Sequence, residues 1–105
     1  MNKLLMRGGR IAAKSTEEKE MRLEGKLFKG NLMIREIVVT RNDPELSFVQ
    51  ELEKALVDLC HTIDVPIPLW LSKNTHEFAA FRQTIFFSDQ YTEEVHFDRF
   101  QIRLL

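Results

Sequence analysis

The chain has 105 residues, of which 44% are hydrophobic and 30% charged, values typical of one globular domain. Its single cysteine excludes an internal disulfide and a multi-cysteine metal centre, and no stretch approaches the run of about 18 apolar residues that spans a membrane. The formal net charge of −1 argues against the overall positive charge of many nucleic-acid-binding proteins.

The first twenty residues differ in composition from the rest of the chain. Residues 1–20 hold five basic and three acidic side chains, and Gly8 and Gly9 interrupt any helix there. They lack the continuous apolar run of about 7–15 residues found in a secretory signal. We therefore predict that residues 1–20 are a disordered tail or a mis-assigned start ahead of Met21, and that residues 21–105 form a single domain.

Two strands joined by a tight turn are predicted at the beginning of this domain. Residues 22–27 alternate polar and apolar side chains, which is typical of a half-buried strand. The pair Gly30-Asn31 favours a hairpin turn, and the Ile- and Val-rich residues 32–40 form the predicted partner strand. The apolar side chains of this second strand change face partway, which predicts a bulge near Glu36 or partial cover on both faces.

A long amphipathic helix is predicted over residues 44–62. Asp43 is a suitable N-cap, and Pro44 suits the first helical position because its missing N–H is not needed there. Lys54 and Asp58 are spaced for an ion pair on the exposed side. Six residues at three- and four-residue steps form the apolar stripe: Val49, Leu52, Leu56, Leu59, Cys60 and Ile63.

The segment that follows the helix is stiff and apolar. Residues 64–71 contain two prolines one residue apart, so they are predicted to be extended and to lie against the domain. Asn74 and Glu77 have the spacing of a capping box. They predict a short second helix that continues to about Arg82.

The last third of the chain adds two more strands. Residues 84–87 favour a strand, residues 88–94 a loop, and residues 99–104 alternate strictly as in a half-buried strand. The predicted order is β-β-α-(short α)-β-β, an α+β domain with a mostly antiparallel sheet covered on one face by the long helix. An exposed sheet edge would then offer a contact for a homodimer.

Cysteine and histidine give little indication of a metal or nucleophilic site. Cys60 and His61 are neighbours on a helix and point about 100° apart, so they are poorly placed to share one ion with His76 or His96. Cys60 lies on the apolar stripe, and we expect a buried thiol rather than a nucleophile. No metal and no cofactor are predicted.

Aromatic residues are concentrated in the carboxy-terminal third. Eight of the ten aromatic side chains follow residue 69 and are interleaved with arginines. This mixture is found in protein-interaction hot spots and in single-strand nucleic-acid sites, although a small core also needs large side chains. The residues from Met21 onward carry an acidic balance, which disfavours nucleic acid as a partner. Trp70 is the aromatic residue that we most expect to have a role beyond the core.

Part of this region resembles a group of short uncharacterised proteins from anaerobic, spore-forming bacteria. The resemblance is carried by Trp70-Leu71-Ser72-Lys73-Asn74, Glu77-Phe78, Phe81-Arg82 and Phe97-Asp98. It implies a bacterial, cytoplasmic protein. It implies no activity and no catalytic or binding residue.

These observations favour a non-enzymatic protein-interaction module or homodimer. Its predicted contact surface comprises Trp70, Leu71, His76, Arg82 and Asp98. The predicted partner is an unknown protein or a second copy of the chain, and no contact with a membrane is predicted. The first alternative is a small enzyme with a pocket near His76, Arg82 and Asp98. The second is a weak single-stranded nucleic-acid binder.

Overall fold

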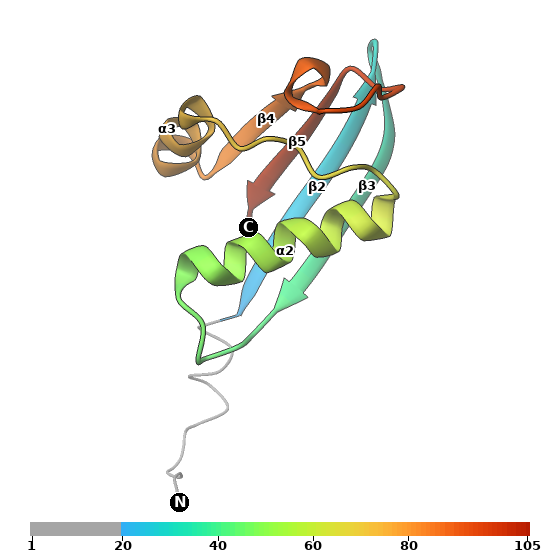
Figure 1. The fold of residues 1–105 in the computed structure, drawn as a ribbon. Coiled ribbons are helices and arrows are strands. Elements are labelled where there is room, and N and C mark those ends of the chain that lie inside the picture. The colour runs from blue at the N-terminus through green and yellow to red at the C-terminus, as the bar shows by residue number, and fades with distance from the viewer. Residues whose placement is uncertain (1–19) are drawn as a thin grey trace, which may run out of the picture.

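Four antiparallel strands and two helices make up the part of the chain that the computed structural model describes, residues 20–105 (Figure 1). In chain order they are β2 (Met21–Lys29), β3 (Leu32–Arg41), α2 (Phe48–Ile63), α3 (Ser72–Phe81), β4 (Gln83–Phe87), the short 3-10 helix η1 (Ser88–Gln90) and β5 (Arg99–Leu104). The predicted α+β class and element order are confirmed. The prediction of a tail or mis-assigned start concerns residues 1–20, all of which except Glu20 lie outside the described residues.

The sheet has the strand order β3-β2-β5-β4, and every neighbouring pair is antiparallel. Both helices lie on the same side of it, with α2 crossing β2 and β3 (Figure 1). The core forms between sheet and helices because most of the strand residues that point inward are apolar. Its fully buried members include Leu23 of β2, Leu59 of α2, Phe86 of β4, and Phe100 and Ile102 of β5.

The β2–β3 hairpin contains a bulge, but at Ile34 rather than near Glu36. The register shifts where Leu27 gives way to Phe28 on β2, and Ile34 is left without a partner residue there. One extra residue reverses the alternation of the strand. Ile37 and Val39, which follow the bulge, therefore face the core on the helix side.

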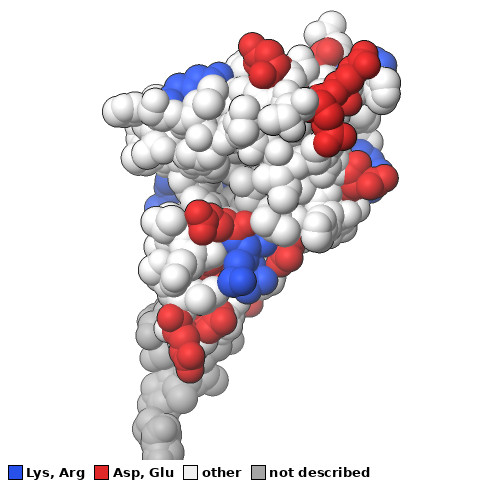
Figure 2. All heavy atoms as spheres, viewed as in Figure 1, with Lys and Arg blue, Asp and Glu red and all other residues white. Residues whose placement is uncertain are grey.

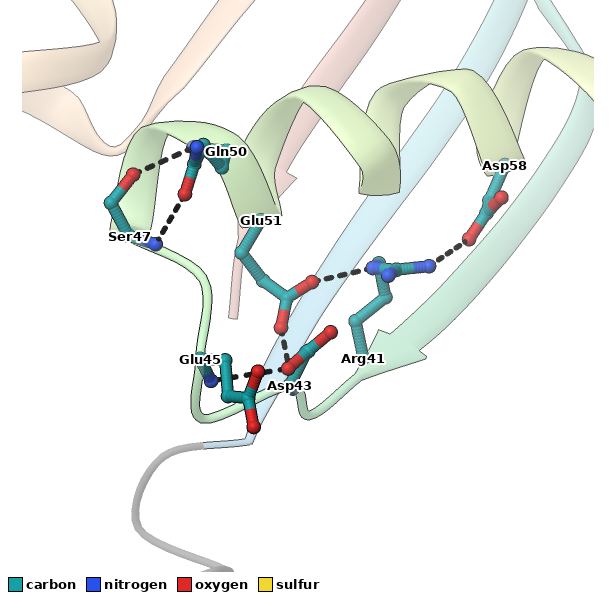
Figure 3. A network of polar contacts seen from close by, with 7 residues as sticks. All are labelled: Arg41, Asp43, Glu45, Ser47, Gln50, Glu51 and Asp58. Carbon is teal, nitrogen blue, oxygen red and sulfur yellow. Dashed lines mark hydrogen bonds and ion pairs between the residues drawn. The ribbon is translucent and has the colours of Figure 1, made fainter.

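Helix α2 begins at Phe48, four residues later than predicted. Asp43 does not cap it, because its Oδ1 accepts a hydrogen bond of 3.1 Å from the backbone N–H of Glu45 and closes a separate turn (Figure 3). Ser47 is the N-cap: its Oγ accepts from the N–H of Gln50 at 3.2 Å, and the Gln50 side chain accepts from the N–H of Ser47 at 2.9 Å. This reciprocal pair satisfies two backbone donors at the helix start.

An ion-pair network fastens the end of β3 to α2 (Figure 3). Arg41 donates from Nε to Glu51 at 2.6 Å and from Nη1 to Asp58 at 2.9 Å, and the second Glu51 oxygen accepts from the N–H of Asp43 at 2.7 Å. The hydrogen bond from Arg41 holds the pKa of Glu51 below its ordinary value. Asp58 thus forms its ion pair with Arg41, whereas the sequence predicted an ion pair with Lys54.

Asn74 lies inside α3 rather than capping it. The helix starts after Leu71, whose backbone N–H donates to Asn74 Oδ1 at 2.9 Å. Asn74 is fully buried: Gln90 donates to the same oxygen at 3.0 Å, and Asn74 Nδ2 donates to Thr84 Oγ1 at 2.8 Å and to a β4 carbonyl at 3.2 Å. Glu77 accepts from the Thr84 hydroxyl, so the predicted capping box is wrong.

Candidate functional site

An apolar groove runs between the two helices and has a volume of about 620 Å³. This lies within the range of about 300–1,000 Å³ typical of ligand pockets. We call it the α2–α3 groove. It is lined by Phe48, Val49, Leu52, Glu53, Leu56 and Val57 of α2, by Ile67, Pro68 and Trp70 of the connecting segment, and by Thr75, Phe78 and Ala79 of α3.

The α2 wall of the groove follows from the helical period. Residues spaced by three and four positions share a face, so Val49, Leu52 and Leu56 reach the groove together. Leu52 and Leu56 are buried as predicted, whereas Val49 is 62% exposed. The assignment of Val49 to the buried core is therefore wrong. Val49 lies at the end of the stripe where the groove opens, and no other described element covers it.

Trp70 packs against two core residues and forms part of the groove wall. Its ring packs against Phe78 and Phe86, with centroid distances of 5.9 and 5.6 Å. Its indole N–H donates to Thr75 Oγ1 at 2.8 Å, and the side chain is 37% exposed on the groove side. The segment before it lies against the domain as predicted, fixed by a backbone hydrogen bond of 2.7 Å from Leu69.

The electrostatics of the groove favour binding over catalysis. Glu53 is the only charged residue among those that line it, and it lies exposed at the rim. The Thr75 hydroxyl is already occupied by the Trp70 indole. A pair of titratable groups or a nucleophile with an adjacent base is thus missing from these walls. The groove can exclude water from apolar groups and offer one carboxylate to a cation.

Two other residues of the predicted contact surface lie at the start of α3 or within it, without lining the groove. Leu71 is the residue before the first helical turn and is exposed. His76 lies within α3 and is also exposed. Trp70 is therefore the one member of the predicted set that lines the groove.

Arg82 and Asp98 lie at opposite ends of β5. The carbonyl of Arg82 accepts from the N–H of Leu104 at 2.8 Å, whereas Asp98 directly precedes the first residue of the strand. Six strand residues correspond to roughly 20 Å. The Asp98 carboxylate accepts from the N–H of Gly30, and its own N–H donates to the carbonyl of Phe28 at 2.9 Å, which fixes the hairpin turn. Arg82 and Asp98 are therefore too far apart to meet in one pocket.

Cys60 is fully buried, as predicted from its place on the apolar stripe. Burial raises the pKa of its thiol to about 12, so the reactive thiolate is scarce at neutral pH. Within residues 20–105, no three His, Cys, Asp or Glu side chains gather closely enough to hold a metal ion. No helix in this part of the chain is long and apolar enough to cross a membrane.

A second surface, which the sequence analysis did not identify, is the side of the sheet that faces away from both helices. We call it the open face. The strand registers bring Phe28, Arg99 and Phe87 side by side on it, from β2, β5 and β4. The alternation of polar and apolar residues along each strand indicates which residues point to this face, because residues between the inward-facing positions point to the opposite side. Strand order, which joins these residues, is not encoded in that alternation.

Comparisons with known proteins supply no relative for this fold: no family model matches the chain, and neither the curated proteins nor the solved structures contain a significant match. The groove and the open face are therefore interpreted from their own geometry.

Proposed function

We propose that the protein is a non-enzymatic interaction module that binds an amphipathic helix of a partner protein in the α2–α3 groove. The observation that carries this proposal is an apolar groove of about 620 Å³ bordered by exposed large side chains. Phe48, Val49 and Ile67 are 53%, 62% and 50% exposed at its walls. Covering such surface stabilises a complex by about 25 cal/mol per Å² of apolar area. Contiguous exposed apolar patches of this kind are typical of protein interfaces.

The shape of the groove supports a helical partner. The α2 residues that line it, from Val49 to Val57, extend over about 12 Å, or roughly two helical turns. A partner helix with apolar residues at positions i, i+4 and i+7 presents a stripe of matching length. The groove is open along one side, so that the polar face of such a helix remains in water.

Glu53 supports a basic residue beside that apolar stripe. It is the only charged lining residue, and within residues 20–105 it forms no ion pair. A Lys or Arg on the partner would complement it, with a modest gain because the site is exposed. The partner chemistry is thus an apolar helical stripe with one flanking cation.

The edge of β3 supports self-association as a second candidate. Among the described residues β3 pairs only with β2, and Leu32, Met33 and Ile34 are exposed near its start. Free strand edges with apolar side chains form contacts between copies of a chain. Sedimentation velocity measures this directly. A concentration-dependent dimer that Leu32→Glu dissociates and Val49→Glu leaves intact would assign the contact to the β3 edge.

The helix-binding proposal is tested by selection from a displayed library of peptides about 16 residues long against the immobilised protein. We expect enrichment of peptides with apolar residues at helical spacing and at least one Lys or Arg. A synthetic enriched peptide is then titrated by fluorescence anisotropy. Val49→Glu should raise its Kd about tenfold or more, because an unpaired carboxylate replaces an apolar wall.

Leu32→Glu is the matched control, since it makes the same kind of change at an exposed site on the hairpin. It should leave the Kd within about twofold. Failure to enrich peptides, enriched peptides without helical periodicity, or equal binding to Val49→Glu would contradict the proposal. So would tight binding of an acyl-chain probe in the groove without any peptide binding.

A further inference from the structure

The open face of the sheet carries a different chemistry from the groove. Neither helix lies over it, because both helices pack on the opposite side (Figure 1). Outward-pointing residues on the four strands form rows across the sheet, and strands are about 5 Å apart while successive outward residues on one strand are about 7 Å apart. The result is a broad surface with regularly spaced side chains rather than a closed pocket.

One row of this face alternates aromatic and cationic side chains. Phe28 of β2 is the register partner of Arg99 on β5, which is in turn the partner of Phe87 on β4. The Arg99 guanidinium lies 4.3 Å from the centroid of the Phe28 ring, and Lys73 Nζ lies 4.7 Å from that of Phe87. Phe87 is 45% exposed. Planar groups are thus presented to solvent beside positive charges.

The balance of positive and negative charge differs between the two sides of the molecule. Of the residues between positions 20 and 105, four of the ten Lys and Arg lie on the open face, against two of the fourteen Asp and Glu. Those two carboxylates, Glu24 and Glu36, both lie near Lys26, at 3.9 and 3.8 Å. The helix side displays both acidic and basic groups (Figure 2). The net charge of −1 therefore does not describe the local charge of this face.

Three of the four cations on this face are arginines, and one of them, Arg103, is the register partner of Glu24. Arg22 and Arg103 point outward from β2 and β5, and neither they nor Arg99 form an ion pair within the described residues. A guanidinium binds phosphate oxygens and also stacks on planar rings. Gln101, between Lys26 and Ile85 in the adjoining row, adds an amide that can donate to and accept from a base edge.

We propose that the open face binds single-stranded nucleic acid, with Phe87 and the Phe28–Arg99 stack as platforms for bases and Arg22 and Arg103 as phosphate contacts. Unpaired bases expose the flat surfaces that such platforms require, whereas bases in a duplex are already stacked. One class of RNA-binding domain stacks two or three bases on aromatic side chains of an uncovered four-stranded sheet in this way. This site is separate from the groove and on the other side of the sheet, so either proposal can fail without the other.

The test is fluorescence anisotropy of the full chain with labelled oligouridine and oligothymidine of about 12 nucleotides, at about 50 and about 200 mM salt, with a DNA duplex as a third arm. We expect binding of one or both single strands that weakens with salt. The ribose and deoxyribose arms identify which nucleic acid is preferred. Absence of single-strand binding at low salt, or tighter binding of the duplex, would overturn the proposal.

Variants assign the binding to this face. Arg99→Gln and Phe87→Ala should each weaken binding about tenfold, since each removes a stacking group, and Arg99→Lys should restore only part of the affinity. Arg103→Gln should reduce the slope of the logarithm of the binding constant against the logarithm of the salt concentration by about one unit. Lys54→Gln, which removes a cation from α2, is the control and should change affinity less than about twofold. Circular dichroism verifies the fold of each variant, and an equal effect of Lys54→Gln would refute the assignment.

Discussion

Arg41 and Glu51 form the tightest ion pair of the domain, with 2.6 Å between Arg41 Nε and Glu51 Oε1 (Figure 3). Glu51 is buried against the last residue of β3, and its other oxygen accepts the N–H of Asp43. The carboxylate therefore joins the strand, the turn and the helix at one point. Because the chain reverses direction between β3 and α2, this contact fastens the first turns of α2 to the end of β3.

This pair makes stability depend on acid pH. The Arg41 contact lowers the pKa of Glu51 in the folded protein, so its contribution to the free energy of unfolding is fully present above the ordinary glutamate pKa. It is lost as the pH falls through the lowered value. We expect Glu51→Gln to be less stable than the wild type in urea unfolding at about pH 7, with a smaller difference at about pH 3.

Glu53→Gln provides the comparison, since Glu53 is exposed and has no ion pair in residues 20–105. It should leave the pH dependence nearly unchanged. A difference between Glu51→Gln and wild type that is the same at both pH values would show that the buried carboxylate acts through shape rather than charge.

Asn74 is the second polar contact on which the fold depends. Asn74→Ala removes the partner of a Gln90 donor and of the Leu71 N–H, and leaves the Thr84 hydroxyl with one donor fewer, all in a buried region. Each unsatisfied buried group costs about 1–3 kcal/mol, so the loss should be about 3 kcal/mol in urea unfolding. Asn42→Ala, at an exposed loop position, should cost less than about 0.5 kcal/mol.

Asn74 also illustrates where sequence reasoning succeeds and where it fails. Strand β5 was predicted with its observed bounds, because alternation of polar and apolar residues directly reports a half-buried strand. The capping assignments at Asp43 and Asn74 failed, because such motifs are short and a tertiary contact from Glu51 or Gln90 decides between several local structures. The confirmed strands β2 and β5 and helix α2 thus follow from patterns repeated over many residues, whereas α3 was predicted from a capping motif that the structure does not contain.

The functional surfaces were harder to predict than the elements. Trp70 was expected to have a second role, and it lines the groove. The α2 residues of the groove wall were assigned to the core, because the apolar stripe of a helix does not reveal which of its ends other elements leave uncovered. The Phe28–Arg99 contact joins residues 71 positions apart in the chain. Such a pairing depends on strand order, which no local pattern specifies.

Gly25 tests how closely α2 approaches the sheet. A methyl group added there would lie 3.0 Å from Phe100 Cε1 and 3.2 Å from Leu59 Cδ2, both shorter than an ordinary contact. Phe100 and Leu59 are fully buried and have little room to move. Gly25→Ala should therefore destabilise the domain by about 1–3 kcal/mol in urea unfolding.

Lys26 follows Gly25 in the chain but points to the open face, so Lys26→Ala provides the comparison. It should lower the free energy of unfolding by less than about 0.5 kcal/mol. A neutral Gly25→Ala variant would mean that α2 can shift away from β2 without loss of packing.

Tyr91 carries a buried hydroxyl that forms no hydrogen bond to any described residue. Its ring packs edge-on against Phe97, with centroids 5.2 Å apart. Tyr91→Phe keeps the ring and removes the unpaired group, so it should stabilise the domain by about 1 kcal/mol in thermal or urea unfolding. Burial raises the pKa of Tyr91, so its phenol should ionise at a higher pH than free tyrosine in an absorbance titration. A destabilised Tyr91→Phe variant would reveal a hydrogen bond made by this hydroxyl.

Trp70 offers a direct measurement of groove occupancy. It is the only tryptophan of the chain, and its exposed side lines the groove, so a bound helix would move the indole from water into an apolar setting. We expect the emission maximum to shift to shorter wavelength when an enriched peptide is added to the wild type, and to remain unshifted in Val49→Glu at the same concentration. Trp70→Ala is a poor substitute for this experiment. The ring packs against Phe78 and Phe86, so its removal should cost about 3 kcal/mol of stability and confuse unfolding with lost binding. A peptide that binds by anisotropy without changing the Trp70 emission would have its site outside the α2–α3 groove.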